Sequence, residues 1–378
     1  MVGTGNIRHW LVWLVCMALL SCGRDSDPVA PNDLPGVPEG VTVGFRISLG
    51  SMGGTRAVQD GYDDGTGTDY ENHIDFPNLD YRFLFFDMQN RYIASFVPTG
   101  IKPSNPGTVR SKTYEVTGKI EQALPEDFKV VALANWTSYP DAPVAGATTL
   151  EEICTSVGSR YEYIPPFRLG ERLIPMYGVR RCEGVTFTQN MHTDLGTIHM
   201  LRAMAKIEVV CRTAGWTLDR VVMHRYNARG FCAPERCFVQ EDYFTPDYTD
   251  EVHLVDGRND ADLKTFAFEK TDDGRFVAYV PEYRNVEAGT QGSPAADVSR
   301  LQVRFRESGQ TEYPVEFLYY ETPPAGSQTG DTFDLRRNYY YRFSITKAAE
   351  PKIAVEVFPY EQVELEPGFG IPSQSETK

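Results

Sequence analysis

The sequence predicts a mainly β protein built from antiparallel sandwiches, and three observations lead to that fold class. Segments rich in Val, Ile, Tyr and Phe alternate apolar and polar residues, which is typical of strands that bury one face. Gly, Asp, Asn and Pro separate these segments at short intervals, as in sheets joined by turns. The chain has 378 residues, which is enough for two ordinary domains.

The chain opens with the pattern of a bacterial export signal. An apolar stretch from Trp10 to Leu20 follows Arg8 and is too short to span a bilayer, which needs about 20 apolar residues. It ends in Leu19-Leu20-Ser21-Cys22, which resembles a lipoprotein cleavage site. We therefore expect residues 1–21 to be removed and Cys22 to be diacylated, since two acyl chains hold a domain on a membrane. An ordinary secretory signal is the alternative.

Residues 22–40 are rich in Pro, Asp and Gly, and we expect them to form a flexible tether that ends at Val41. The net charge of −15 argues against nucleic acid and anionic lipid headgroups as partners. Five cysteines remain beyond the signal and Cys22, and an odd number at irregular spacing indicates no disulfide framework. Cys232 and Cys237 could close a small loop or remain two thiols, and the sequence leaves both open.

Strands are expected wherever the alternation is regular. Thr149 to Val157 is the exception, because Thr-Leu-Glu-Glu is typical of a capped helix start. Ser308-Gly309 predicts a hairpin turn between two strands. The expected strands are Val41 to Leu49, Tyr81 to Asp87, Tyr92 to Phe96, Ser111 to Val116, Lys129 to Ala134, Ala205 to Cys211, Thr217 to His224, Arg275 to Val280, Leu301 to Arg306, Tyr313 to Leu318, Tyr339 to Thr346 and Ile353 to Val357.

Several short segments, in order and over most of the chain, resemble the fimbrillin-type pilus proteins of Bacteroidales, which include fimbrial subunits and related anchor lipoproteins. The segments are IDFPNLDYRFLFFD (74–87), VVALAN (130–135), IPMYG (174–178), LRAMAKIEV (201–209), YVPEY (279–283) and NYYYRFSI (338–345). The resemblance implies two tandem transthyretin-like β-sandwich domains, at residues 41–199 and 200–370. The composition of residues 371–378 predicts a disordered tail. It also implies assembly on the outer membrane with other fimbrial subunits.

The resemblance further implies a way to assemble. In fimbrillins that polymerise, an arginine-specific protease cuts a loop after the first strand, and the groove left by that strand accepts a strand of the next subunit. Here Arg56, followed by Ala57, matches that processing site by position, and the candidates for strand exchange on the first strand are Val41, Val43, Phe45 and Ile47. Thr55-Arg56-Ala57 could equally be an unprocessed surface loop, as in anchor-type relatives.

Near the end of the chain Ile353, Val355 and Val357 alternate with other residues and predict a strand. This strand could be donated to another subunit, or it could be the ordinary last strand of the second sandwich.

Catalysis, cofactors and metals are not expected. The histidines lie in unrelated contexts, and no HExxH, GxSxG or phosphate-loop motif is present. Asp60 to Glu71 places Asp60, Asp64, Gly65 and Glu71 at four positions of a calcium-loop pattern, yet Tyr62 stands where a ligand belongs and no amphipathic helix flanks it. We expect a solvated acidic loop there.

The sequence therefore favours a structural adhesion protein of surface fimbriae, with a host or bacterial surface receptor as a further partner. The alternatives are a non-polymerising fimbrial anchor, a carbohydrate-binding surface lipoprotein and an enzyme of unknown class. Carbohydrate binding would use exposed aromatic side chains, for which Trp136, Tyr139, Tyr319 and Tyr320 are the candidates.

Overall fold

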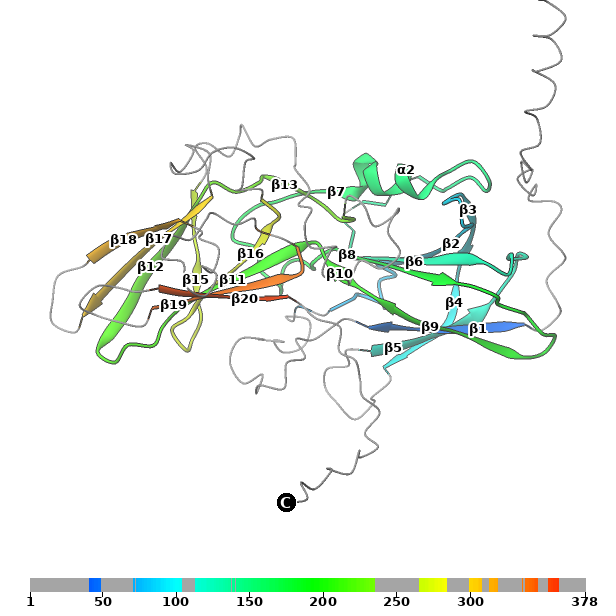
Figure 1. Ribbon diagram of the computed structural model, residues 1–378, viewed down its shortest axis with the longest axis horizontal. Helices are drawn as coiled ribbons and strands as arrows, with labels where there is room; N and C mark the ends of the chain where they lie inside the picture. The colour runs from blue at the N-terminus through cyan, green and yellow to red at the C-terminus, as the bar shows by residue number, and fades with distance from the viewer. Residues whose placement is uncertain are drawn as a thin grey trace, which may run out of the picture. The chain divides into compact units, whose positions relative to one another are not determined.

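The computed structural model describes residues 41–48, 71, 73–103, 113–136, 138–139, 141–234, 265–283, 299–307, 313–318, 335, 337–345 and 353–359. Strands dominate these ranges (Figure 1). The helices described within them are short, namely α2 (Leu150–Thr155) and the 3-10 helix η2 (Val157–Ser159).

Two sheets form the first sandwich, called sandwich 1. One sheet has the order β4-β5-β1-β9, and its strands are β4 (Pro98–Pro103), β5 (Thr113–Lys119), β1 (Thr42–Ser48) and β9 (His192–His199). The other has the order β10-β8-β6-β2-β3, with β10 (Leu201–Arg202), β8 (Met176–Cys182), β6 (Phe128–Ala134), β2 (Tyr81–Phe86) and β3 (Tyr92–Phe96).

Two further sheets form sandwich 2. The first is β15 (Glu269–Lys270), β16 (Phe276–Pro281), β11 (Met204–Cys211), β19 (Tyr339–Ile345) and β20 (Ile353–Pro359), in that order. The second is β14 (Thr265–Ala267), β12 (Trp216–His224), β17 (Arg300–Glu307) and β18 (Tyr313–Leu318). A separate small pair joins β7 (Arg160–Glu162) to β13 (Arg229–Phe231).

Both sandwiches follow one strand plan. The first strand of each, β1 or β11, lies between an antiparallel neighbour, β5 or β16, and a parallel one, β9 or β19. The predicted all-β fold of sandwiches is confirmed, and the parallel pair in each is a feature that the alternation could not show. β20 adds a strand beyond β19, whereas β9 ends its sheet in the part of the chain described.

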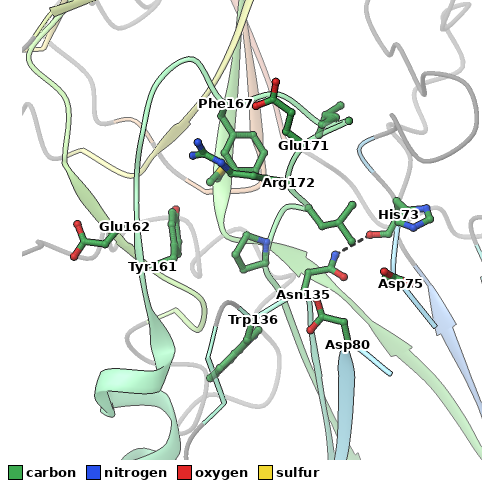
Figure 2. A pocket seen from close by; sticks show the side chains of 15 residues that line it. His73, Asp75, Asp80, Asn135, Trp136, Tyr161, Glu162, Phe167, Glu171 and Arg172 are labelled. Carbon is green, nitrogen blue, oxygen red and sulfur yellow. Dashed lines mark hydrogen bonds between the residues drawn. The ribbon is translucent and has the colours of Figure 1, made fainter. Parts of the chain in front are cut away.

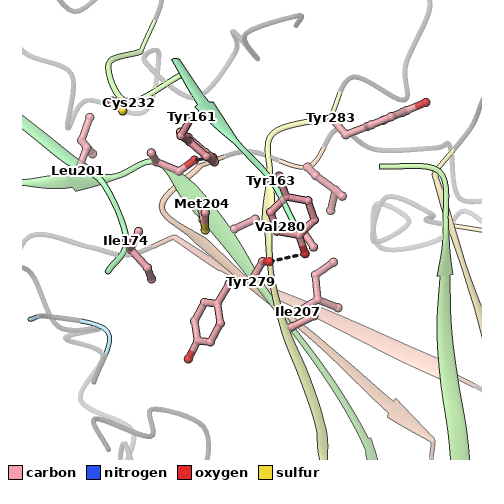
Figure 3. Packing of buried hydrophobic residues seen from close by; sticks show 14 of the residues in the cluster. Tyr161, Tyr163, Ile174, Leu201, Met204, Ile207, Cys232, Tyr279, Val280 and Tyr283 are labelled. Atoms are coloured by element: carbon pink, nitrogen blue, oxygen red, sulfur yellow. Dashed lines mark hydrogen bonds between the residues drawn. The ribbon is translucent and has the colours of Figure 1, made fainter. Parts of the chain in front are cut away.

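The sandwich interiors hold the apolar faces that the alternation predicts. In sandwich 1, side chains of both sheets meet in one cluster, which includes Val43, Phe83 and Val130. A second cluster fills sandwich 2 and continues to Tyr161 and Tyr163 (Figure 3). There the Tyr163 hydroxyl donates to the Tyr279 carbonyl oxygen at 2.8 Å, so a buried phenol keeps a polar partner.

Sheet membership changes between Arg202, which pairs with β8, and Met204, the first residue of β11. We propose that the two domains divide here, just after the predicted boundary at Met200. No helix among the described residues is both long enough and apolar enough to cross a membrane.

Helix α2 begins as its sequence predicts. The Thr149 hydroxyl accepts from the Glu152 N–H at 3.2 Å, and the Glu152 carboxylate accepts from the Thr149 N–H at 2.9 Å. Leu150 and Ile153 lie on the inner side of the helix and are buried in the core. Replacing Thr149 by Ala removes the cap, and we expect a loss of about 1 kcal/mol in the free energy of unfolding, measured by urea titration. No loss would contradict the capping geometry.

Candidate functional site

The candidate site is the place of β1 in its sheet, called the β1 seat and defined by β1 with its neighbours β5 and β9. All seven residues of β1 pair with β5, from Thr42 opposite Lys119 to Ser48 opposite Thr113. On its other side β1 runs parallel to β9 (Figure 1). The first strand among the described residues is thus an internal strand of its sheet, with backbone partners on both edges.

The side chains of β1 alternate between the core and the outside. Val43, Phe45 and Ile47 are 0%, 2% and 1% exposed. The Phe45 ring lies 5.1 Å from that of Phe83 and 5.4 Å from that of Phe96, between centroids. Val41, just before the strand, is also buried. The four candidates for strand exchange therefore all lie in the interior.

The pairing of β1 with β9 contains an irregularity. The register shifts between Gly44, opposite Asp194, and Arg46, opposite Thr197. Gly196 lies at the shift with a φ of +82°, a conformation that glycine adopts without strain. A Cβ on Gly196 would also lie 2.5 Å from the guanidinium of Arg180.

The outer face of β1 is polar. The Arg46 guanidinium donates to the Asp194 carboxylate at 3.0 Å and to the Thr197 hydroxyl at 3.3 Å. Burial raises the pKa of Asp194, but hydrogen bonds from the Gly196 N–H and from Arg46 outweigh it and hold that pKa below its usual value. Both side chains of this ion pair are about half exposed, so it stabilises the strand only slightly.

Removal of β1 would leave both its backbone partners and its apolar contacts unsatisfied. Backbone groups of β5 and β9 would lose their partners, and the apolar surface under Val43, Phe45 and Ile47 would meet water. Both costs are removed when another extended segment with alternating apolar residues takes the same place. The β1 seat therefore fits one strand. The backbone hydrogen bonds and apolar contacts that it offers are the same whether that strand comes from this chain or from another.

Several residues singled out from the sequence fall elsewhere. Cys22, Arg56, Ala57 and Cys237 lie outside the described residues. Cys232 is buried, which raises the pKa of its thiol.

Ile353, Val355 and Val357 lie on β20, opposite Ile345, Phe343 and Tyr341 of β19. This is the position of an ordinary last strand of sandwich 2, one of the two alternatives.

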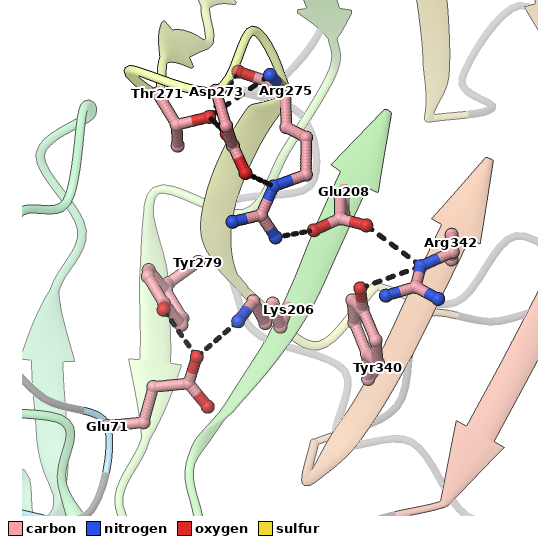
Figure 4. A network of polar contacts seen from close by, with 9 residues as sticks. All are labelled: Glu71, Lys206, Glu208, Thr271, Asp273, Arg275, Tyr279, Tyr340 and Arg342. Atoms are coloured by element: carbon pink, nitrogen blue, oxygen red, sulfur yellow. Dashed lines mark hydrogen bonds and ion pairs between the residues drawn. The ribbon is translucent and has the colours of Figure 1, made fainter. Parts of the chain in front are cut away.

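One buried polar network was missed by sequence reasoning (Figure 4). On β11 the Lys206 ammonium pairs with Glu71, whose carboxylate also accepts from the Tyr279 hydroxyl at 2.7 Å. Two residues further on, Glu208 accepts from Arg342 at 2.8 Å and from Arg275 at 2.6 Å. Alternation had indicated a polar face of the sheet, but these charges are buried instead of solvated.

This network corrects the expectation for the acidic loop at its last residue. Glu71 is 1% exposed and ion-paired, so it is no solvated carboxylate. Across the described parts of the chain, no three His, Cys, Asp or Glu side chains gather as a metal site.

Two of the aromatic residues proposed for sugar stacking are not on an open face. Trp136 is 2% exposed, and its indole N–H donates to the Met176 carbonyl oxygen at 3.0 Å. The Tyr139 ring stacks on it at 6.1 Å and lies under Arg82. The prediction that Trp136 and Tyr139 form an exposed aromatic platform for sugars is therefore wrong. Tyr319 and Tyr320 lie outside the described residues.

The β-sandwich fold is shared with a solved structure. The tip fimbrial protein Mfa3 from Porphyromonas gingivalis, solved with a C-terminal truncation, aligns with a TM-score of 0.53 and 13% identity over 84% of this chain and 99% of that one. The fimbrillin-type resemblance expected from the sequence is thus confirmed for the fold.

Two structures from Parabacteroides distasonis ATCC 8503 also align. One, of a candidate cell adhesion protein, has a TM-score of 0.46 and 14% identity over 86% of this chain and 98% of that one. The other, of a fimbrial assembly protein, has a TM-score of 0.40 and 15% identity over 84% and 98%. No protein-family model matches the sequence, and no curated protein matches it either.

Proposed function

We propose that this protein is a structural adhesion component of surface fimbriae, carried to the outer membrane as a lipoprotein on Cys22 and assembled by strand exchange at the β1 seat. The observation that carries the proposal is that the first strand among the described residues is an internal, core-forming strand. Such a strand leaves a specific acceptor groove when it is removed. The fold shared with a fimbrial tip protein supports the same reading.

The proposed sequence of events has two steps. Acylated Cys22 holds the precursor on the outer membrane, facing the cell surface. Cleavage after Arg56 then separates Cys22 and β1 from the rest of the chain, and a strand of another fimbrial subunit fills the vacated seat. The C-terminal residues Ile353, Val355 and Val357 are one source of such a strand. Without the cleavage the same chain would remain an anchor.

A binding role without catalysis fits the described residues best. The partners would be other fimbrial subunits, the outer membrane through the lipid, and a receptor on a host or bacterial surface. No cofactor or metal is required by this role.

Processing is tested on surface-sheared material, with and without an arginine-specific protease. We expect N-terminal sequencing to give a new terminus at Ala57, together with a high-mass ladder in gels of unboiled samples. The Arg56→Gln variant is the control and should give neither. An intact acylated terminus without a ladder would rule out polymerisation by this route and leave the anchor role.

Lipid attachment is tested by Cys22→Ser, which removes the sulfur that carries the acyl chains. We expect the variant to leave the membrane fraction, because each buried methylene contributes about 0.8 kcal/mol to anchoring. Cys16→Ser, within the signal segment, is the matched control and should stay membrane-bound. Persistent attachment of Cys22→Ser would refute the lipid assignment.

A further inference from the structure

A cavity of about 460 Å³ lies at the end of β6, beside the segment that connects β7 to β8. Figure 2 shows Asn135 and Asp80 on one side of it and Phe167 and Arg172 on the other. Trp136 closes part of the wall with its buried ring. The volume is in the ordinary range for small-molecule sites.

Asn135 lines this cavity and carries an unsatisfied acceptor. Its side-chain N–H groups donate to the carbonyl oxygens of His73 at 2.7 Å and Ile174 at 3.0 Å. These two acceptors fix which way the amide faces, so the other end of the amide must be the oxygen. The residue is only 4% exposed, and its Oδ1 is buried and has no hydrogen-bond partner among the described residues. A buried acceptor without a donor is costly, and a ligand hydroxyl that reached it would remove that cost.

The backbone at Asn135 points the same way. Its φ is 58°, in the left-handed region, where asparagine is tolerated but other side chains are strained. The backbone conformation therefore favours asparagine at this place in the cavity wall.

Asp80 supplies a second acceptor. The Tyr139 hydroxyl donates to its Oδ1 at 2.9 Å. Burial is the main cause that raises the pKa of Asp80, with the nearby charge of Asp75 acting in the same direction. A ligand that donates to this carboxyl group would stabilise its charged form.

The opposite wall supplies a donor and an apolar surface. Arg172 donates to the Ile164 carbonyl oxygen at 3.0 Å through one nitrogen, and its guanidinium lies 6.0 Å from the Phe167 ring centroid. Both side chains are partly exposed and line the cavity. A ligand between the walls therefore meets acceptors on one side and a cation beside a ring on the other.

The charges of the wall favour a neutral ligand. Two of its carboxylates are already paired on the outside, Glu162 with Arg229 at 2.8 Å and Glu171 with Arg168 at 3.0 Å. Asp75 and Asp80 also line the cavity, where Asp75 accepts from Asn78 at 2.6 Å and Asp80 accepts from Tyr139 at 2.9 Å, and Arg172 belongs to the same lining. A cation would be repelled by Arg172 and an anion by the two aspartates, whereas a group that both donates and accepts hydrogen bonds satisfies both walls.

We propose that this cavity binds one pyranose ring of a neutral saccharide. Ring hydroxyls donate to Asn135 Oδ1 and Asp80 and accept from Arg172, while a C–H face of the ring packs on Phe167. The site is separate from the β1 seat, so it adds a glycan specificity to the proposed fimbrial protein and does not depend on how subunits assemble.

The test uses the full chain and a panel of free glucose, galactose, mannose and N-acetylglucosamine, with L-argininamide as a cationic probe. Saturation-transfer NMR at about 10 mM detects the millimolar dissociation constants expected of a single ring. We expect at least one sugar to bind and L-argininamide not to bind. Arg172→Met and Phe167→Ala should each weaken sugar binding about tenfold, since each removes one wall contact.

Arg181→Met is the matched control, because Arg181 is exposed on β8, pairs with Glu183, and neither residue lines the cavity. It should keep wild-type sugar binding, and circular dichroism should show all three variants folded. No binding by any sugar, equal binding by wild type and both cavity variants, or binding of L-argininamide alone would each overturn the proposal. The fimbrial ladder should form normally in Arg172→Met, so failure here is distinguishable from failure of the proposed assembly.

Discussion

Phe45→Ala is expected to lower the free energy of unfolding of sandwich 1 by about 3–5 kcal/mol. The ring is 2% exposed and packs against Phe83 and Phe96, so truncation removes its buried area and leaves a cavity that rigid neighbours cannot fill. Equilibrium unfolding in urea, followed by tryptophan fluorescence and circular dichroism, measures the change.

Arg46→Ala is the control on the same strand. Its side chain points outward and its ion pair with Asp194 is about half exposed, so its loss should cost no more than about 1 kcal/mol. Equal effects of the two substitutions would show that β1 does not bury its inner face in the core. The same comparison in cleaved protein should show faster release of β1 when Phe45 is truncated.

Glu208→Ala is expected to lower the free energy of unfolding by about 3–5 kcal/mol, because it removes a buried carboxylate and leaves two guanidinium groups without that partner. Glu208 is 1% exposed and accepts from both Arg275 and Arg342. Burial tends to lower the pKa of Arg275, but its hydrogen bonds to Glu208 and Asp273 outweigh this and raise it. Thermal unfolding, read together with urea midpoints, gives the loss.

Asp273→Ala is the matched control, because Asp273 pairs with the same Arg275 from its exposed side. It should change stability by less than about 1 kcal/mol. Equal losses of unfolding free energy in Glu208→Ala and Asp273→Ala would contradict the claim that burial makes the Glu208 carboxylate important for stability.

Local sequence was sufficient where a strand or helix carries its own signal. Tyr92 to Phe96 carries Tyr, Ile and Phe within five residues, which favours a strand, and it forms β3 at the predicted residues. The reciprocal cap of Thr149 and Glu152 lies within one turn of chain, so the start of α2 could be predicted as well. The alternation from Val41 to Leu49 predicted β1 as well.

Strands that depend on their neighbours were missed. β9 contains Asp194 and Gly196 at its irregular register with β1, which interrupts the alternation that sequence reasoning needs. β8 carries Gly178, whose missing Cβ lets the His199 carbonyl oxygen approach. Both strands are fixed by tertiary pairing more than by their own pattern.

The polar features were missed for a related reason. Lys206 and Glu208 alternate along β11 as solvated residues would, and only the fold shows that they are buried among Glu71 and two arginines. The cavity at Asn135 likewise unites Asp80, Asn135 and Arg172, which no local spacing connects. The alternation of apolar and polar residues along a strand does not predict contacts between residues that are far apart in sequence.

The central claim is that β1 must leave its seat before subunits can join. Arg46 and Glu115 lie opposite one another on β1 and β5, so Arg46→Cys with Glu115→Cys offers a reversible lock on the outer face of the sheet. Each single cysteine variant is a control for unrelated thiol chemistry.

The decisive measurement is the high-mass ladder formed by this double variant after arginine-specific cleavage, with and without reductant. We predict that the oxidised protein is cut but keeps its first strand and forms no ladder, and that reduction restores the ladder to the level of the single variants. A ladder of equal intensity from the oxidised, locked protein would contradict strand exchange at the β1 seat.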